Sequence, residues 1–270
     1  MFNRSIETNK TPKGTGVQKN DTNPFSLWDI PLALVLLTRL PLPRLPEPVF
    51  KRQAQAAWAF PIAGLAVGAI ACLVGWLAMV FHLPPFVAAT LLVAMLIMTT
   101  GAIHEDGLAD TFDGLWGGFT AERRLEIMKD SQIGTYGVLA LVVSQLARVS
   151  AVATILATGS IWAILAACVF SRALMPVLMA SLPNARKSGL SHSVGTPGAI
   201  SVSMSLGLAV TIAVFLCGGA AITAIFSAAL VAAILALTAR KKIGGQTGDI
   251  LGASQQLAEI AFLLAISAQI

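Results

Sequence analysis

The sequence predicts an all-α, polytopic integral membrane protein with six to seven transmembrane helices and an N-terminal helix that is interfacial or re-entrant. Hydrophobic residues make up 56% of the chain and charged residues only 11%, whereas a soluble domain carries about 25% charged residues. Several uninterrupted apolar runs approach the ~20 residues that a helix needs to cross a bilayer. Almost every charge lies between these runs.

The chain begins with a polar stretch, residues 1–26, that lacks the apolar core of a signal peptide. Its composition predicts a disordered tail, and residues 27–270 are predicted to form a single membrane-embedded catalytic domain. Leu27–Leu40, which contains Asp29 and Arg39, has about 11 apolar residues, too few to span a membrane, so we expect an interfacial or re-entrant helix. The "PLPRLPEP" that follows cannot continue a helix.

Six further apolar runs are predicted to span the membrane, and a shorter seventh closes the chain. They cover approximately residues 57–81, 86–103, 136–158, 161–182, 199–216, 219–237 and 257–270. The connections alternate in character, because those at 82–85, 159–160 and 217–218 carry no formal charge while the others are rich in Lys and Arg. Short basic connections stay cytoplasmic. We therefore expect a multi-pass membrane protein whose charged connections, including residues 104–134, face the cytoplasm.

Composition also argues against two other classes of protein. Cys72, Cys168 and Cys217 lie inside or at the edge of apolar runs, without the spacing of a disulfide framework or a zinc site. The net charge of +5 comes from basic residues scattered between apolar segments without interleaved aromatic residues. This pattern indicates membrane topology, and no nucleic-acid partner is expected.

The most informative motif is "GAIHEDGLADTFDGLWGG", residues 101–118, which follows an uncharged apolar run. Asp106, Asp110 and Asp113 stand at i, i+4 and i+7, so on a helix they fall within an arc of about 60°. Carboxylates this close repel one another, and they stay ionised together when a cation lies among them. Hard oxygen ligands favour Mg²⁺, Mn²⁺ or Ca²⁺. A solvated acidic face is the alternative, and the position beside a membrane segment favours the metal site.

Neighbouring residues of this motif have less specific roles. Glu105 points about 100° away from Asp106 on the helix and is the poorer metal ligand. His104 is suited to orienting a ligand or binding phosphate, and equally to being a neutral imidazole at the interface. Gly107 and Gly114 leave one flank of the helix bare, which permits the close approach of a neighbouring helix or of a bulky substrate.

Two further segments carry candidate substrate contacts. "ERRLEIMKDSQIGTYG", residues 122–137, supplies Lys129 and Asp130 together with two arginines; cations beside a metal site suit a polyphosphate, although a lipid-facing basic fringe has the same appearance. "KKIGGQTGDILGA", residues 241–253, has glycines that expose backbone amides for a phosphate, or that simply allow close helix packing. Asp249 opens the helix that follows.

Two arginines, Arg148 and Arg172, lie within apolar spans. An unpaired charge there costs at least ~2.5 kcal/mol, so we expect each to lie near the cytoplasmic end or to face a polar cavity. Arg172 is close in sequence to "PNARKSG" and is the better candidate for a phosphate contact.

Four segments together resemble the cobalamin-5′-phosphate synthase family, whose members are adenosylcobinamide-GDP ribazoletransferases. The segments are "LTRLPLP" (37–43), "HEDGLADTFDG" (104–114), "RRLEIMKDSQIGTYG" (123–137) and "GGQTGDILGA" (244–253). They occur in the family's order, and the resemblance covers nearly everything after residue 26.

The resemblance implies the last assembly step of vitamin B12. In that step α-ribazole, or its 5′-phosphate, displaces GMP from adenosylcobinamide-GDP and yields adenosylcobalamin or its 5′-phosphate. It implies that Asp106, Asp110 and Asp113 hold Mg²⁺ against the diphosphate, and that one of them or Asp249 is the general base. The candidate substrate-binding residues are Arg39, His104, Lys129, Asp130, Arg172, Gly245 and Gln246.

Two alternatives fit the pattern less well. A CDP-alcohol phosphotransferase that makes lipids is expected to have an Arg soon after its first Asp-Gly, but here Asp110 follows at once and the next Arg is Arg123. A cation transporter would place its ion site near the bilayer midplane, whereas these carboxylates lie at a helix end among other charges. The sequence leaves open the phosphorylation state of α-ribazole, the lower base, and whether the chain forms homo-oligomers or joins a membrane assembly of cobalamin enzymes.

Overall fold

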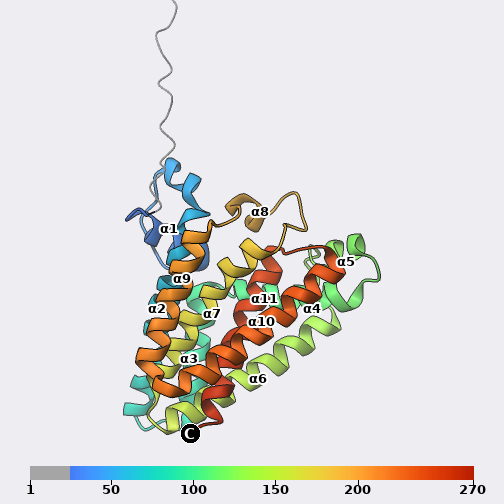
Figure 1. Cartoon of the computed structure of the whole chain (residues 1–270). Helices are drawn as coiled ribbons and strands as arrows, with labels where there is room; N and C mark the ends of the chain where they lie inside the picture. The colour runs from blue at the N-terminus through green and yellow to red at the C-terminus, as the bar shows by residue number, and fades with distance from the viewer. Residues whose placement is uncertain (1–24) are drawn as a thin grey trace, which may run out of the picture.

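The computed structural model describes residues 25–270, and this part of the chain is all-helical (Figure 1). The tail predicted for residues 1–26 therefore lies, except for its last two residues, outside the described residues. The helices are α1 (Asp29–Leu37), η1 (Glu47–Arg52), η2 (Gln55–Ala59), α2 (Phe60–Val80), α3 (Pro85–Thr100), α4 (Ile103–Gly117), α5 (Ala121–Ile127), α6 (Thr135–Ala157), α7 (Ile161–Ser181), α8 (Leu190–Val194), α9 (Ala199–Cys217), η3 (Gly218–Ala220), α10 (Ala221–Ile243) and α11 (Gly248–Ser267).

Length and hydropathy confirm a polytopic membrane protein. Five helical stretches within residues 25–270 are long and apolar enough to cross a membrane: Gln55–Val80, Thr135–Ala157, Ile161–Ser181, Ala199–Ile243 and Gly248–Ser267. The fourth of these contains both α9 and α10. A sixth span results if α3 and α4 are taken together. The nine-residue α1 is too short to span, as predicted.

The chain bends sharply between the apolar helix α3 and the carboxylate-bearing helix α4. Gly101 and Ala102 both adopt left-handed backbone conformations, with φ of 66° and 58°, and the axes of the two helices differ by 88°. Arg39 packs against this break, because its backbone N–H donates to the Thr99 carbonyl at 2.7 Å and its side chain lies beside Gly101. The carboxylates are thus carried on a helix that turns away from the apolar run preceding it.

Helix α4 crosses α11 at a pair of glycines. A methyl group added at Gly107 would come within 2.9 Å of the Asp249 carbonyl oxygen, and one at Gly252 within 3.2 Å of the Ile103 carbonyl oxygen. Small residues at a crossing let two backbones approach closely. The prediction that Gly107 admits a neighbouring helix is confirmed, and the crossing sets the first turn of α11 beside the first turns of α4.

Below this crossing, buried charged groups join four helices. Arg148 of α6 donates to Glu105 of α4 at 2.9 Å and to Glu259 of α11 at 2.6 Å. Arg172 of α7 lies 3.5 Å from the other oxygen of Glu259 and donates to the Cys168 carbonyl at 2.9 Å. Two cations and two anions balance here, so the two intramembrane arginines pair with carboxylates inside the bundle.

Candidate functional site

A polar pocket of about 210 Å³ lies where α4, α11 and the 184–192 segment meet. Asp106 and Asp249 contribute carboxylates to its wall, and Arg186 contributes a guanidinium. Its remaining lining residues are mostly small or polar: Ile103, Asn184, Ser188, Gly189, Leu190, Ser191, His192, Gln246, Thr247 and Gly248. Two of the four segments singled out in the sequence, residues 104–114 and 244–253, therefore meet at one pocket.

Three carboxylates from two helices lie at or near this pocket: Asp106 and Asp249 line it, and Asp110 interacts electrostatically with both. Asp106 is exposed and Asp110, one turn further along α4, is half-buried. Asp106, Asp249 and Asp113 all act electrostatically on Asp110, and the Arg186 guanidinium is the cation that opposes them. Negative charge therefore exceeds positive charge around Asp110, as a site for a cation requires.

Asp113 has a different environment from the other two carboxylates of α4. It is buried, and its oxygens accept the backbone N–H groups of Gly134 at 2.7 Å and Gly137 at 2.9 Å. Gly134 is the N-cap of α6, so this carboxylate satisfies amides that the start of a helix leaves free. Asp113 ties α4 to α6, although the sequence places it on one face with Asp106 and Asp110.

Asp249 stands in the first turn of α11, where the helix start is set by Thr247. The Thr247 hydroxyl accepts the Ile250 N–H at 3.3 Å and donates to the Asp249 carboxylate at 3.2 Å. The same carboxylate forms an ion pair with Arg186 at 2.9 Å. Arg186 also donates to the Leu125 carbonyl at the end of α5, at 3.3 Å. One guanidinium thereby connects α11, α5 and the loop after α7.

The glycine-rich loop before α11 is held by pairing with the loop after α7. The Gln246 N–H donates to the Pro183 carbonyl, and the Ala185 N–H donates to the Gln246 carbonyl, both at 2.8 Å. The Gln246 side chain is buried, donates to Asn184 at 2.7 Å and accepts from the Ser191 hydroxyl at 2.6 Å. Gly245 has no room for a side chain, because a Cβ atom there would collide with Pro183. Gln246 lines the pocket, whereas the space at Gly245 is taken by this pairing.

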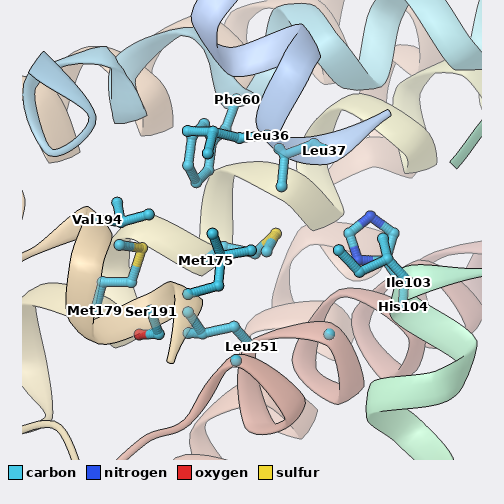
Figure 2. A pocket seen from close by; sticks show the side chains of 13 residues that line it. Leu36, Leu37, Phe60, Ile103, His104, Met175, Met179, Ser191, Val194 and Leu251 are labelled. Carbon is cyan, nitrogen blue, oxygen red and sulfur yellow. The ribbon is translucent and has the colours of Figure 1, made fainter. Parts of the chain in front are cut away.

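His104 lies beside a second, apolar cavity of about 60 Å³ that adjoins the polar pocket. Figure 2 shows His104 on one wall, with Met175 and Leu251 among the other lining side chains. The two cavities share Ile103, Leu190, Ser191 and Gly248. His104 is buried, and its Nε2 atom has no hydrogen-bond partner in the described part of the chain.

The remaining candidate residues lie elsewhere. Arg172 is buried in the ionic network and is paired with Glu259. Lys129 and Asp130 are exposed beyond α5 and line none of the described cavities. Arg39 is exposed and lines a separate hollow of about 450 Å³ formed by residues 35–50. The structure does not bring these four together at the carboxylate pocket.

The carboxylates near the pocket suit an open magnesium site better than a site in which protein side chains supply every ligand. Within residues 25–270 no group of three or more His, Cys, Asp or Glu side chains is arranged to hold a metal ion, and the Asp113 carboxylate of the predicted set accepts backbone N–H groups at the start of α6. Mg²⁺ is usually held by one or two carboxylates together with waters and substrate phosphates. Asp106 and Asp110, with Asp249 beside them, fit that more open arrangement.

Sequence reasoning missed the contribution of the segment after α7. Arg186, Asn184 and Ser191 all reach the pocket, yet none belongs to the acidic or glycine-rich motifs. The available signal was a polar, glycine- and serine-containing connection, "PNARKSGLSHS", between two apolar helices. That signal marks a loop, but only the pairing of residues 183–185 with Gln246 shows that this loop lies against α11.

Known proteins are similar to this chain over most of its length. The family model described as cobalamin-5-phosphate synthase matches residues 29–267. An adenosylcobinamide-GDP ribazoletransferase of Bradyrhizobium diazoefficiens is 43% identical over 245 residues, which cover 89% of this chain and 93% of that protein. Proteins of the same name from a Sinorhizobium species and from Azorhizobium caulinodans are each 42% identical, covering 88% and 89% of this chain and 95% of each relative. No solved structure matches. The chain therefore belongs to the cobalamin-5-phosphate synthase family.

Proposed function

We propose that the protein is an adenosylcobinamide-GDP ribazoletransferase that joins α-ribazole, or its 5′-phosphate, to adenosylcobinamide-GDP. The observation that supports this most directly is the α4–α11 crossing, which brings Asp106 and Asp249 to one polar pocket, with Asp110 one turn further along α4 and within electrostatic reach of both. Family membership supplies the substrates, and the carboxylate-lined pocket supplies chemistry that suits them. The protein is a multi-pass membrane enzyme, and the proposed membrane is the bacterial inner membrane.

The reaction is the attack of an alcohol on a diphosphate. The ribose hydroxyl oxygen of α-ribazole forms a bond to the phosphorus that carries cobinamide, the anhydride bond to the second phosphorus breaks, and GMP leaves with that electron pair. The hydroxyl proton passes to one of the pocket carboxylates of Asp106, Asp110 and Asp249 acting as general base. Phosphoryl transfer of this kind depends mainly on positioning and on neutralising charge.

Asp106 and Asp110 are the proposed magnesium ligands, with Asp249 close enough to influence the same site electrostatically. Mg²⁺ bound there would neutralise charge on the diphosphate. Asp113 keeps its proposed importance, but as the group that fixes the start of α6 against α4. Gln246 and His104 remain proposed substrate contacts, because each lines a cavity at this site.

The active site is proposed to face the cytoplasm. The pocket is lined by residues of charged segments, including the loop that leads into α8. Figure 1 shows α8 and α5 at one end of the bundle and the C-terminus at the other. Short connections rich in Lys and Arg remain on the cytoplasmic side.

The proposal is tested with purified protein in lipid nanodiscs supplied with adenosylcobinamide-GDP, α-ribazole-5′-phosphate and Mg²⁺. We expect GMP and adenosylcobalamin-5′-phosphate to appear in equal amounts, and neither to appear when the acceptor is omitted. Release of GMP at the same rate without acceptor would indicate hydrolysis and contradict the proposed transfer.

A further inference from the structure

The polar pocket is short of positive charge for a diphosphate. Its wall contains the carboxylates of Asp106 and Asp249, and Arg186 is the one lysine or arginine among its lining residues in the described chain. Two basic residues that the sequence suggested as phosphate contacts do not line this pocket. Arg172 is buried against Glu259, and Lys129 lines no described cavity. Any guanidinium contact that a phosphate makes in this pocket therefore has Arg186 as its source.

Some N–H groups of the Arg186 guanidinium are not used in contacts within the described chain. A guanidinium has five N–H groups. In Arg186 one Nη atom forms an ion pair with Asp249 at 2.9 Å, and the other donates to the Leu125 carbonyl at 3.3 Å. Its Nε atom is buried and has no hydrogen-bond partner in residues 25–270. A buried donor without an acceptor is unfavourable, and a phosphate oxygen is an acceptor that the planar guanidinium fork suits well.

We propose that Arg186 binds the diphosphate of the GDP-activated corrinoid, and that Asp249 holds its guanidinium at the pocket before the donor arrives. The assignment rests on the proposed function and deepens it by naming the residue that contacts the donor. The pair is largely buried, with side-chain exposures of 15% for Arg186 and 20% for Asp249, so its attraction is weakly screened by solvent. Arg186 is thereby kept in place without substrate, and its remaining donors are free for the diphosphate.

If Arg186 has this role, its substitution should weaken binding of the donor, adenosylcobinamide-GDP, and leave binding of the acceptor, α-ribazole-5′-phosphate, unchanged. The test is equilibrium dialysis of adenosylcobinamide-GDP against the full-length protein in nanodiscs without acceptor, with the corrinoid measured by its absorbance. We expect Arg186→Ala to raise the Kd of the donor about 10- to 100-fold and to leave the KM of α-ribazole-5′-phosphate unchanged. Arg186→Lys keeps the charge but loses the fork, so its donor Kd should lie between those of the parent and Arg186→Ala. Added guanidinium ions should partly restore donor binding to Arg186→Ala.

Lys187 is the matched control, because it is the next residue, is exposed and lines no described cavity. Lys187→Ala should bind the donor like the parent. The inference is overturned if Arg186→Lys and Arg186→Ala both bind the donor with the parental Kd. It is also overturned if donor and acceptor affinities fall together without rescue by guanidinium, since that is the result of a purely structural role. Failure of the proposed function is distinct, because the parent itself would then neither bind adenosylcobinamide-GDP nor release GMP.

Discussion

Asp106, Asp110 and Asp113 share one helical face in the sequence, but the structure gives them unequal surroundings. Asp106 lines the polar pocket and Asp110, one turn further along α4, is half-buried, whereas Asp113 accepts two backbone N–H groups at the start of α6. Helical spacing correctly placed the residues on one arc. It could not show that Gly134 and Gly137, more than twenty residues later, present N–H groups to the third carboxylate.

Asp113→Asn should therefore act mainly on stability. The amide side chain has one acceptor oxygen in place of two and brings its own NH₂ group towards backbone donors, so we expect a loss of about 1–3 kcal/mol and a lower apparent Tm. Asp130→Asn is the comparison, because Asp130 is exposed and, among residues 25–270, accepts the N–H of nearby Gln132, and the Tm of this variant should stay near the parental value. A normal Tm for Asp113→Asn combined with a raised Mg²⁺ requirement would instead make Asp113 a metal ligand.

Glu259 is the residue on which the buried ionic network depends most. It pairs with both Arg148 and Arg172, so Glu259→Ala leaves two buried cations short of a partner and should destabilise the fold by about 3–5 kcal/mol. Glu126→Ala removes an exposed pair with Arg123 and should change stability by only about 0–1 kcal/mol. Thermal unfolding of both variants in detergent measures the difference. Equal Tm values for the two variants would show that the network does not hold the four helices together.

At the scale of elements, the site depends on how closely α4 approaches α11. Gly107 and Gly252 meet at the crossing, and this contact sets Asp249 beside the carboxylates of α4. Gly107 was recognisable in the sequence as part of a bare helix flank, but the identity of the partner helix was not, because any apolar helix can cover such a flank. The bend at Gly101 and Ala102 was likewise hidden, since the apolar run 86–103 reads as one continuous helix.

Gly107→Ala tests this crossing. The added methyl group would lie 2.9 Å from the backbone oxygen of Asp249, and because backbone cannot rotate away, the two helices must separate. We expect the rate of GMP release to fall at least about tenfold, equivalent to about 1.4 kcal/mol. In Gly117→Ala, on the same helix, the added methyl group would lie 3.6 Å from the Ile127 side chain, an ordinary van der Waals distance, and this variant should keep the parental rate. Parental turnover in Gly107→Ala would mean that the close crossing does not position the site.

At the scale of the whole molecule, composition and charge distribution were sufficient to predict the membrane-spanning class, because both follow from the bilayer as solvent. Six spans, counting the bent pair, match the lower end of the predicted six to seven, whereas five without it are one fewer. The position of the loop after α7 could not be predicted in this way. Arg186 reaches the pocket because this loop pairs with the loop before α11, and hydrophobic periodicity does not predict pairing between loops.

The orientation of the bundle can be measured by cysteine labelling after the three native cysteines are replaced by alanine. Ser188 and Pro84 are both exposed and lie in a basic and an uncharged connection, respectively. We expect Pro84→Cys to react with a membrane-impermeant maleimide in intact cells, and Ser188→Cys to react only after the cells are opened. Labelling of position 188 in intact cells would reverse the orientation and place the pocket outside the cytoplasm.

The central claim is that the carboxylates gathered at the α4–α11 crossing carry out the transfer. The measurement that tests it most directly is the initial rate of GMP release as a function of Mg²⁺ concentration for Asp106→Asn, Asp110→Asn and Asp249→Asn, with exposed Glu122→Gln as the control. We expect each aspartate variant to lose at least about 100-fold in rate, about 2.7 kcal/mol, with the remaining activity of Asp106→Asn and Asp110→Asn requiring more Mg²⁺. Parental rates in Asp106→Asn and Asp110→Asn at limiting Mg²⁺ would contradict the claim and leave the acidic face of α4 without a catalytic role.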